Sequence, residues 1–549
     1  MTALCGLYGV ASIRRIEAAW LAQSAPGSLM ARAAAAVADE ATRMLRRLPP
    51  ETTVLLLVGP GNNGGDALEA GRLLSQRGFA VRACAVASVI SEPPRAPDAA
   101  AAWQAWHAAG MGLHPVDDEG SWRSQGRPLV IDGLFGIGLV RRLPSSLAPL
   151  LAWIDSIDAP VLAIDVPSGI DADSGAAVED GPCVRANVTV TMIADKPGLH
   201  TGAGLASAGK VLVATLSDHA EPGAPASGTL MVRGVPADAV LLDAGAARHL
   251  LPPRRIDAHK GTSGDVLVIG GRLGMTGAAR LAARGAIGAG AGKVWIGGDP
   301  HASGAADADR PEIMRDTIGS TMPIPPRVKV VVIGCGLGQD RQARQYLLSA
   351  IASRALLVCD ADALNLLSAQ PRLAELVRQR EAATILTPHP LEAARLLSWP
   401  TARVQADRVA AALALARRFD AMAVLKGAGT IIASPSGRYA INASGNPVLA
   451  AGGTGDVLAG IVAGLAAAMV GSKDSAAGGG LAAAAAAAAA ATAAAAAACC
   501  AVWLHGAAGD LAAKRRGPVG VPAGAIADLL PEVIRLELRA PTACAGETR

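Results

Sequence analysis

The sequence predicts an α/β protein with two doubly wound domains, and two observations lead to this expectation. Short runs of β-branched residues and leucine alternate with amphipathic stretches, the pattern of parallel sheets whose strands are joined by helices. The alternation is interrupted by a Pro/Gly/Ser-rich stretch at residues 221–228 and then restarts, with no fixed-period repeat. We therefore place one domain at residues 1–222 and a second at residues 230–540.

Each domain is expected to contain one sheet. The first domain begins with one or two helices over residues 14–48, and its strands are predicted at 53–58, 80–85, 129–132, 161–165, 188–193 and 211–214. In the second domain the strands are predicted at 265–269, 293–296, 328–333, 356–360, 384–386, 423–425 and 430–433.

Composition and charge exclude several classes of function. The 549 residues carry 50 Lys plus Arg against 46 Asp plus Glu, and a net charge of +4 on so long a chain argues against nucleic acid or a membrane surface as the main partner. The eight cysteines form no C-x-x-C pair and the nine histidines no H-E-x-x-H pattern, so neither a structural zinc site nor a disulfide framework is expected. No basic start followed by an apolar stretch marks a signal peptide, and we expect a cytoplasmic protein.

An alanine-rich segment, residues 481–504, is the one stretch that resembles a membrane span. Alanine favours helix but contributes little transfer free energy, and no cationic or aromatic belt flanks both ends. We expect an elongated helix of a soluble protein, away from the chemistry.

A glycine-rich turn, residues 59–66 (GPGNNGGD), follows the first predicted strand. Its glycines allow a ligand to approach the backbone closely, and the helix behind them favours phosphate. Asn62 and Asn63 interrupt the spacing of a Rossmann G-x-G-x-x-G. A phosphate or dinucleotide loop is predicted, with an ordinary glycine-rich turn as the alternative.

Two aspartates, Asp132 and Asp165, end later strands of the same predicted sheet. Ligands of doubly wound sheets bind outside the carboxyl ends of the strands, so these carboxylates are candidates for acid/base chemistry or cation binding. Alternatively, each could cap the turn or helix that follows it.

These stretches together resemble the N-terminal domain of the NAD(P)H-hydrate epimerase family, a Rossmann-like α/β/α sandwich. The motifs are GNNGGD at 61–66, DGLFGIGL at 132–139 and DVPSGIDADSG at 165–175. The resemblance implies that Asp165 is the acid/base at the epimerised carbon and also contacts the substrate. The other implied substrate contacts are Asn62, Asn63, Gly64, Gly65, Asp66, Gly136, Ile137, Gly138 and Leu139. It also implies a potassium ion held by Asn63, Asp132 and Ser168, whose oxygen ligands suit a hard cation.

In the second domain, residues 452–456 (GGTGD) open a predicted helix. Free amides there can bind a phosphate, and the carboxylate of Asp456 can act as a base beside the transferred group. No Walker A motif is present. A glycine-rich helix start without chemistry is the alternative.

This segment resembles the anion-hole motif of ribokinase-like kinases, and the pieces upstream resemble ADP-dependent NAD(P)H-hydrate dehydratases in particular. Those pieces are HKG at 259–261, GMTGAA at 274–279, GCGLG at 334–338, DADALN at 360–365, TPHP at 387–390 and KGAGT at 426–430. Val448 stands where this family usually has a glycine in the loop before GTGD.

The resemblance implies a role for each of these motifs. Asp456 is the implied catalytic base and also contacts the substrate. The implied nucleotide-binding residues are Lys426, Gly427, Ala428, Gly429, Thr430 and Gly455. The implied hydrate pocket contains Ala278, Gly336, Gly338 and His389, although His389 taken alone could equally be a core histidine.

The two resemblances together imply a bifunctional enzyme that repairs hydrated NADH and NADPH. The first domain would interconvert the R and S epimers, and the second would dehydrate the S epimer with ADP, giving AMP and phosphate. Potassium, magnesium and ADP are the implied cofactors, small molecules the partners, and a homo-oligomer the expected assembly. Two alternatives stay open: a ribokinase-like small-molecule kinase with a non-catalytic dinucleotide-binding first domain, and a first domain that binds without turnover.

Overall fold

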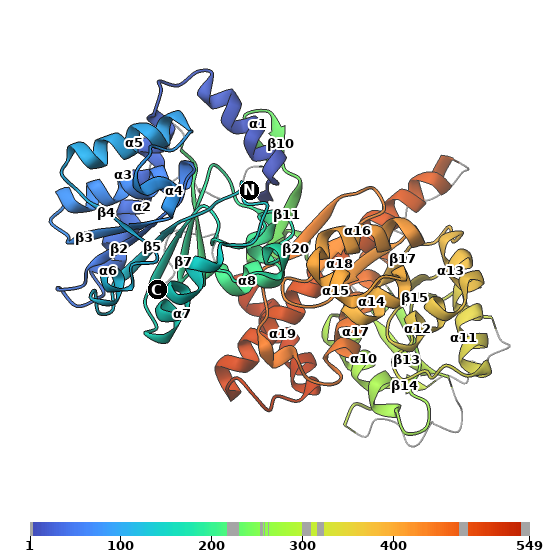
Figure 1. Cartoon of the computed structure of the whole chain (residues 1–549). Coiled ribbons are helices and arrows are strands. Elements are labelled where there is room, and N and C mark those ends of the chain that lie inside the picture. The colour runs from blue at the N-terminus through green and yellow to red at the C-terminus, as the bar shows by residue number, and fades with distance from the viewer. Residues whose placement is uncertain are drawn as a thin grey trace. The chain divides into compact units, whose positions relative to one another are not determined.

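The structure is a computed structural model that describes residues 4–216, 230–252, 256, 259–261, 263–298, 309–315, 323–471 and 481–539. The chain separates into two compact units that meet in sequence between Val240 and Leu241 (Figure 1). The predicted boundary stretch at 221–228 lies outside the described residues.

The first unit contains a seven-stranded parallel sheet in the order β4-β3-β2-β5-β6-β7-β8. Its strands are β2 (Val54–Val58), β3 (Val81–Ala85), β4 (Leu113–Pro115), β5 (Leu129–Gly133), β6 (Val161–Ile164), β7 (Val188–Met192) and β8 (Lys210–Ala214). The chain winds outward from β2 in one direction and from β5 in the other. The switch point between β2 and β5 is where doubly wound sheets bind ligands.

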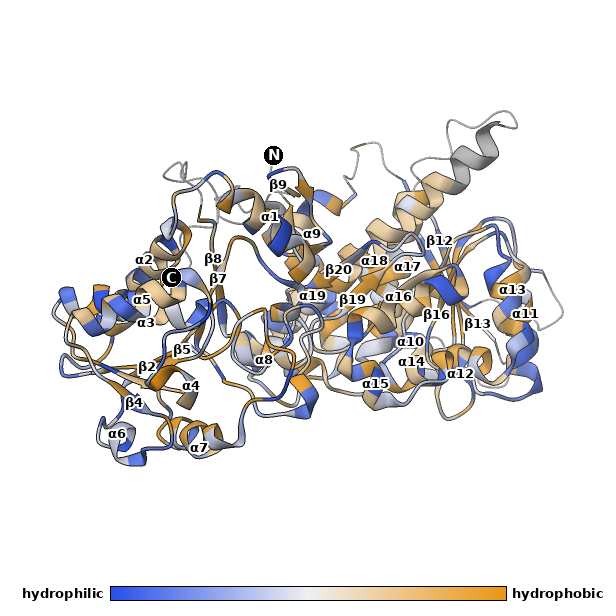
Figure 2. Ribbon diagram, turned by 45° about the horizontal axis from the view of Figure 1, so that its top comes forward, coloured by the Kyte–Doolittle hydropathy of each residue, from blue (hydrophilic) through white to orange (hydrophobic). Residues whose placement is uncertain are grey.

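Helices cover both faces of this sheet, with α2, α3 and α5 on one face and α6 and α7 on the other (Figure 1). The helices are α1 (Val10–Leu21), α2 (Ser28–Leu45), α3 (Asn62–Gln76), α4 (Ala87–Ile90), α5 (Pro97–Ala108), α6 (Glu119–Arg123), α7 (Ala148–Ser156) and α8 (Gly202–Ala208). Short strands lie at β1 (Cys5–Leu7), β9 (Met231–Val232) and β10 (Val235–Pro236). Because both faces are covered, β2 is apolar throughout and completely buried (Figure 2).

The second unit contains a larger sheet, ordered β20-β19-β18-β17-β16-β15-β12-β13-β14 over its main part. The strands are β11 (Ala239–Leu242) at the unit boundary, β12 (Asp265–Ile269), β13 (Lys293–Gly297), β14 (Ile313–Arg315), β15 (Val328–Ile333), β16 (Leu356–Cys359), β17 (Thr384–Leu386), β18 (Met422–Leu425), β19 (Ile431–Ala433) and β20 (Tyr439–Asn442). In the order of the sheet, all neighbouring strands between β14 and β18 are parallel. Strand β19 pairs antiparallel with both β18 and β20.

Two groups of helices pack on this sheet, with α10, α17, α18 and α19 together and α11 to α16 on the opposite side (Figure 1). Their bounds are α9 (Ala244–Leu250), α10 (Thr276–Gly288), α11 (Arg341–Ala352), α12 (Asp362–Ala369), α13 (Pro371–Arg378), α14 (Pro390–Leu397), α15 (Thr401–Ala406), α16 (Arg408–Phe419), α17 (Thr454–Gly471), α18 (Leu481–Arg516) and α19 (Ala523–Arg539).

The alanine-rich segment forms one long helix, α18, as the sequence predicts. Among the described residues it provides the only segment, Ala488–Arg516, that is long and apolar enough to cross a membrane. Of its most apolar window 56% is buried inside the structure, and the helix packs on α9, α17 and α19. The second half of α18 is therefore a core element of this unit.

Candidate active sites

A cavity of about 510 Å³ opens in the first unit at the carboxyl ends of β2, β5 and β6. Most of the residues predicted to contact substrate line it: Asn62, Asn63, Asp66, Gly136, Ile137, Gly138, Leu139 and Asp165. Gly64 and Gly65 do not line it. Their amides are used inside the first turn of α3, and a Cβ at Gly64 would lie 2.0 Å from the Gly59 carbonyl oxygen. These two glycines allow α3 to pack closely behind the cavity.

A hydrogen-bond network lies beneath the cavity, around the completely buried Asp132. Ser168 donates its hydroxyl to Asp132 Oδ1 at 2.7 Å and its amide to Oδ2 at 2.8 Å, and Leu134 N donates to Oδ1 at 3.2 Å. Burial raises the pKa of Asp132 to about 6, against the lowering effect of these hydrogen bonds. The alternative that Asp132 caps the following turn is partly realised, since it accepts the Leu134 amide.

Asn63 connects this network to the cavity. Its Nδ2 donates to the Ile164 carbonyl at 2.9 Å, which fixes the side chain beside the end of β6. A Cβ at Gly136 would lie 3.0 Å from Asn63 Oδ1 and 3.1 Å from Asp165 Oδ2, so the glycine loop passes close to both oxygens. Asn63, Asp132 and Ser168 thus present oxygen atoms around one end of the sheet.

Asp165 is held by a buried lysine, Lys196. The Lys196 Nζ atom lies 2.8 Å from Asp165 Oδ1, and the Lys196 side chain has no exposed surface. Nζ also donates to Thr191 Oγ1 at 2.7 Å, to Met192 O at 3.0 Å and to Ala194 O at 3.2 Å. Because Met192 N donates to the same Oδ1, this oxygen is fully engaged and Oδ2 faces Gly136 on the cavity wall.

Three further carboxyl groups, Glu17, Asp66 and Asp98, line the cavity. Burial, followed by the negative charge of Asp165, raises the pKa of Glu17 and raises that of Asp66 well above its usual value. The cavity therefore combines a lysine-paired carboxylate with two carboxyl groups whose pKa values are raised.

Sequence motifs point to neither Lys196 nor Glu17. Lys196 follows β7 in the stretch Ala194–Gly198, and a single lysine after a strand carries no catalytic signature. Glu17 lies on α1, far from the cavity in sequence. Glu17 stands where the resembled family usually has an aspartate on an N-terminal helix, and the sequence alone assigned it no role.

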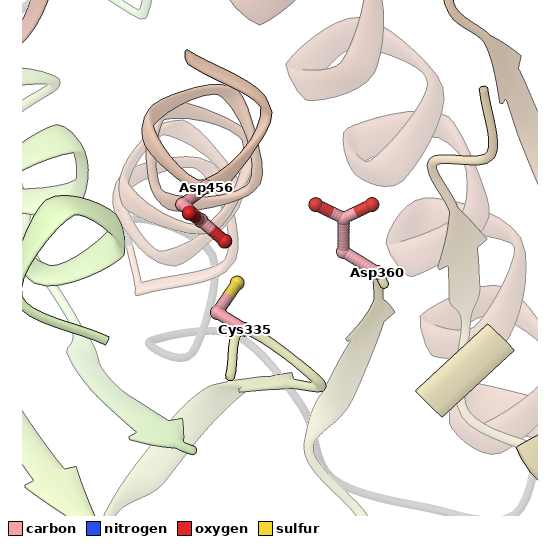
Figure 3. A group of neighbouring side chains, drawn as sticks. All are labelled: Cys335, Asp360 and Asp456. Atoms are coloured by element: carbon pink, nitrogen blue, oxygen red, sulfur yellow. The ribbon is translucent and has the colours of Figure 1, made fainter. Parts of the chain in front are cut away.

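In the second unit, Asp456 in the first turn of α17 faces Cys335 after β15 and Asp360 after β16 (Figure 3). The Cys335 Sγ atom and one oxygen of each carboxylate lie within 4.8 Å of one another. Lys426, after β18, donates from Nζ to Asp360 Oδ1 at 2.8 Å. Burial first, and then the charge of Asp360, raises the pKa of Asp456 to about 6.

This cluster does not fit a magnesium ion held by protein groups alone. Mg²⁺ prefers oxygen ligands, whereas the cluster offers a thiol, a carboxylate already paired with Lys426, and only Asp456 as a carboxylate without a lysine partner. Burial, followed by the nearby carboxylates, raises the pKa of the Cys335 thiol well above its usual value, so the thiol stays protonated.

The predicted nucleotide-binding residues lie around Lys426. A Cβ at Gly455 would lie 3.2 Å from Lys426 Nζ, so the start of α17 directly adjoins the amine. Gly427 has a φ of +135°, and its carbonyl accepts the Thr430 hydroxyl at 3.1 Å, which folds the segment with Ala428 and Gly429 into a tight turn. The amides and the lysine together form a cationic corner beside Asp456.

Three of the residues predicted for the hydrate pocket lie close to this corner. Gly336 has a φ of +62° and lies close to Ala278. A Cβ added at Gly336 would lie 3.2 Å from the Ala278 Cβ. Gly338 N donates to Asp362 Oδ2 at 2.8 Å.

His389 is an N-cap and not a core histidine. Its Nδ1 accepts the amides of Leu391 and Glu392 at the start of α14, and its side chain is 46% exposed. Burial and the charge of Lys426 lower its pKa.

The loop before GTGD is anchored to α18. Asp510 accepts the Gly445 amide at 2.9 Å and Asn446 Nδ2 at 2.7 Å, and Asn446 Oδ1 accepts the Val448 amide. Val448 is buried and has an ordinary negative φ, so the loop tolerates this residue where the family usually has glycine. The helix that carries the alanine-rich segment therefore positions the catalytic loop.

The buried pair in the first unit gives a stability prediction. Lys196→Met should destabilise the protein by about 3–5 kcal/mol, because Asp165 loses its partner while it stays buried. Lys196→Met combined with Asp165→Asn should restore much of that loss. Urea unfolding monitored by tryptophan fluorescence measures both, with Lys210→Met on exposed β8 as a control expected to be near neutral. Equal stability of Lys196→Met and wild type would contradict the pairing.

Two family models match the chain, one in each unit. The NAD(P)H-hydrate dehydratase family matches residues 266–532, and the YjeF-related protein N-terminus family matches residues 26–198. A structure of the Bacillus subtilis ADP/ATP-dependent NAD(P)H-hydrate dehydratase, co-crystallised with ATP/Mg²⁺, is 28% identical and covers 54% of this chain and 98% of that chain, with a TM-score of 0.46.

Full-length relatives share both parts. The bifunctional NAD(P)H-hydrate repair enzyme Nnr of Coxiella burnetii is 35% identical over 493 residues, which cover 89% of this chain and 91% of the relative. The enzyme of the same name from Escherichia coli is 34% identical and covers 88% and 85%, and that from Gloeobacter violaceus is 35% identical and covers 96% and 97%. The chain belongs to the family of bifunctional NAD(P)H-hydrate repair enzymes.

Proposed function

We propose that this chain interconverts the epimers of hydrated NADH and NADPH at Asp165 and dehydrates the S epimer with ADP at Asp456. The proposal assigns the epimerase to residues 1–222 and the dehydratase to residues 230–540. The observation that carries it is that each unit of a chain from this family holds an aspartate at a sheet-edge site beside a lysine and a glycine-rich loop.

At the first site, the hydrated ring carbon carries a hydroxyl group next to the ring nitrogen. Changing its configuration requires one bond to that carbon to break and re-form. If the ring C–N bond opens, the hydroxyl gives up its proton as it becomes an aldehyde and the nitrogen takes a proton, and closure on the other face of the aldehyde reverses both transfers. Asp165 Oδ1 is held by Lys196 and Met192 N, which leaves Oδ2 to exchange the proton. Asp66 and Glu17, whose pKa values are raised, can supply a proton from the same cavity.

The proposed potassium ligands fit a hard monovalent cation. Asn63, Asp132 and Ser168 offer oxygen atoms, and Asp132 is a fully buried carboxyl whose hydrogen bonds from Ser168 and Leu134 come from neutral donors. A bound potassium ion would supply positive charge beside that carboxylate.

At the second site, Asp456 accepts the proton of the substrate hydroxyl as that oxygen attacks the terminal phosphorus of ADP. Lys426, the turn at 427–430 and the start of α17 hold the phosphates. The transferred phosphate makes the oxygen a good leaving group. Its departure, with loss of a proton from the neighbouring carbon, restores the ring double bond and gives AMP and phosphate. Magnesium would arrive with the nucleotide phosphates, since the protein groups here form no cage for it.

The remaining parts of the proposal concern location and partners. The substrates are small molecules, and the modest net charge gives no reason for a nucleic-acid or membrane partner. We place the protein in the cytoplasm, as a homo-oligomer.

The dehydratase activity can be tested by the near-ultraviolet absorbance of NADPH regenerated from pure S hydrate with ADP and magnesium. Wild type should regenerate NADPH, and Asp456→Asn should lose at least about 100-fold in rate, because general-base catalysis contributes about 10²–10⁴-fold. A stable phosphorylated product with no NADPH would instead identify a small-molecule kinase.

The pH dependence of dehydration follows from the raised pKa of Asp456. The base must be ionised to accept a proton, so kcat/KM should fall about tenfold per pH unit below about 6 and level off above it. A rate profile from pH 4.5 to 8.5 at saturating ADP measures this. A rate that stays constant down to pH 4.5 would contradict Asp456 as the base.

Potassium should stabilise the first unit. Exchanging sodium for potassium at constant ionic strength should raise the Tm of wild type, because a cation that binds only the folded state stabilises it. The rise should vanish in Asp132→Asn and persist in the exposed-site control Asp158→Asn. An equal rise in all three proteins would place the potassium effect elsewhere.

A further inference from the structure

Cys335 occupies a rigid position at the carboxyl end of β15. Its flanking glycines have φ values of +122° at Gly334 and +62° at Gly336, a conformation that other residues rarely adopt. A Cβ at Gly334 would lie 1.8 Å from the Asp360 carbonyl oxygen, and the Cys335 carbonyl accepts the Gly271 amide at 3.0 Å. The completely buried thiol therefore has a direction fixed by the backbone.

The thiol points at Asp456. Figure 3 shows the sulfur directed from its loop toward the Asp456 carboxylate, with Asp360 on the facing strand end. One carboxylate oxygen of Asp456 lies within 4.8 Å of the thiol sulfur, whereas Lys426 directs its hydrogen bond to Asp360. The two carboxylates thus have different neighbours, an ammonium group at Asp360 and a thiol at Asp456.

The charged groups around Asp456 come from several elements. Asp360 after β16 and Asp362 in α12 disfavour its ionised form, and Lys426 after β18 and the Cys335 hydrogen bond favour it. Because the thiol is buried beside two carboxylates, it keeps its proton and remains a donor. A thiol is a weak donor, so it can orient the carboxylate without removing its basicity.

We propose that Cys335 is a positioning residue of the dehydratase site, whose thiol donates a hydrogen bond to Asp456 and holds that carboxylate in its ionised, proton-accepting state. The inference rests on the proposed role of Asp456 as the base, and it adds a residue that acts through Asp456 and does not touch the reacting atoms.

The test compares pH–rate profiles of S-hydrate dehydration for wild type, Cys335→Ser and Cys335→Ala. In Cys335→Ala the donor is lost, so the fall of the rate at low pH (the acid limb of the profile) should move to higher pH by about one unit. The rate at pH 5 should then be about tenfold lower than that of wild type, with a smaller loss above pH 8. Cys335→Ser keeps a donor and should leave the limb at or below the wild-type position.

Cys359→Ala is the matched control, because Cys359 is equally buried at the end of the neighbouring strand β16 but lies outside the cluster. Titration of ADP itself is common to all four proteins.

A uniform loss of rate in Cys335→Ala, with the acid limb unmoved, would reduce Cys335 to a packing residue and overturn the proposal. A second measurement does not depend on catalysis. The S–H stretching band of Cys335 is the one that disappears from the infrared spectrum in Cys335→Ala. It should lie at lower frequency in wild type than in Asp456→Ala, because a hydrogen bond to Asp456 weakens the S–H bond. Equal frequencies in the two proteins would also overturn the proposal. Full activity of Asp456→Asn would instead refute the proposed base, and the infrared comparison would still decide whether the thiol donates.

Discussion

A lysine that is completely or mostly buried and paired with a strand-end aspartate sets the charge of each site. Lys196 lies 2.8 Å from Asp165 in the first unit, and Lys426 lies 2.8 Å from Asp360 in the second. Ionised carboxylates are costly to bury, and each site gathers several of them at one sheet edge. The positive charge of each lysine lowers the free-energy cost of burying these carboxylates. Because each lysine pairs with one carboxylate, the others at the same site have no cationic partner.

The unpaired carboxyl groups are the ones with raised pKa values. Asp66 and Glu17 in the first unit and Asp456 in the second lie beside negative charge without a direct lysine contact. Asp66 is buried and the other two are half-buried, and desolvation is the main cause of each shift. Neighbouring carboxyl groups whose environments differ in this way are suited to opposite roles in proton transfer. In the first unit, this difference separates Asp165, which is paired with Lys196, from Asp66 and Glu17. In the second, it separates Asp456 from Asp360, which is paired with Lys426.

Sequence reasoning reached the fold and most of the residues at both sites, because parallel sheets bring strand ends to one edge. The apolar runs that became β2, β5 and β12 are long and continuous, and the motifs follow them directly. The strands that the sequence did not predict are short, with two to four residues each: β1, β4, β9, β10, β11, β14 and β20. Neither β4 nor β14 reads as an apolar run. The surroundings of Lys196 and Cys335 are formed by residues that are distant in sequence and meet at the sheet edge. A single residue of this kind leaves no periodic pattern in the sequence.

The account's central claim is that the two units carry out two separable steps in one chain. Pure R NADPH hydrate, supplied with ADP and magnesium, needs both steps before NADPH absorbance returns. Asp165→Asn alone should recover only what spontaneous epimerisation allows, and Asp456→Asn alone should recover nothing. An equimolar mixture of the two variants should restore recovery, because each variant retains the site that the other lacks. Failure of the mixture, with both variants folded, would contradict the claim.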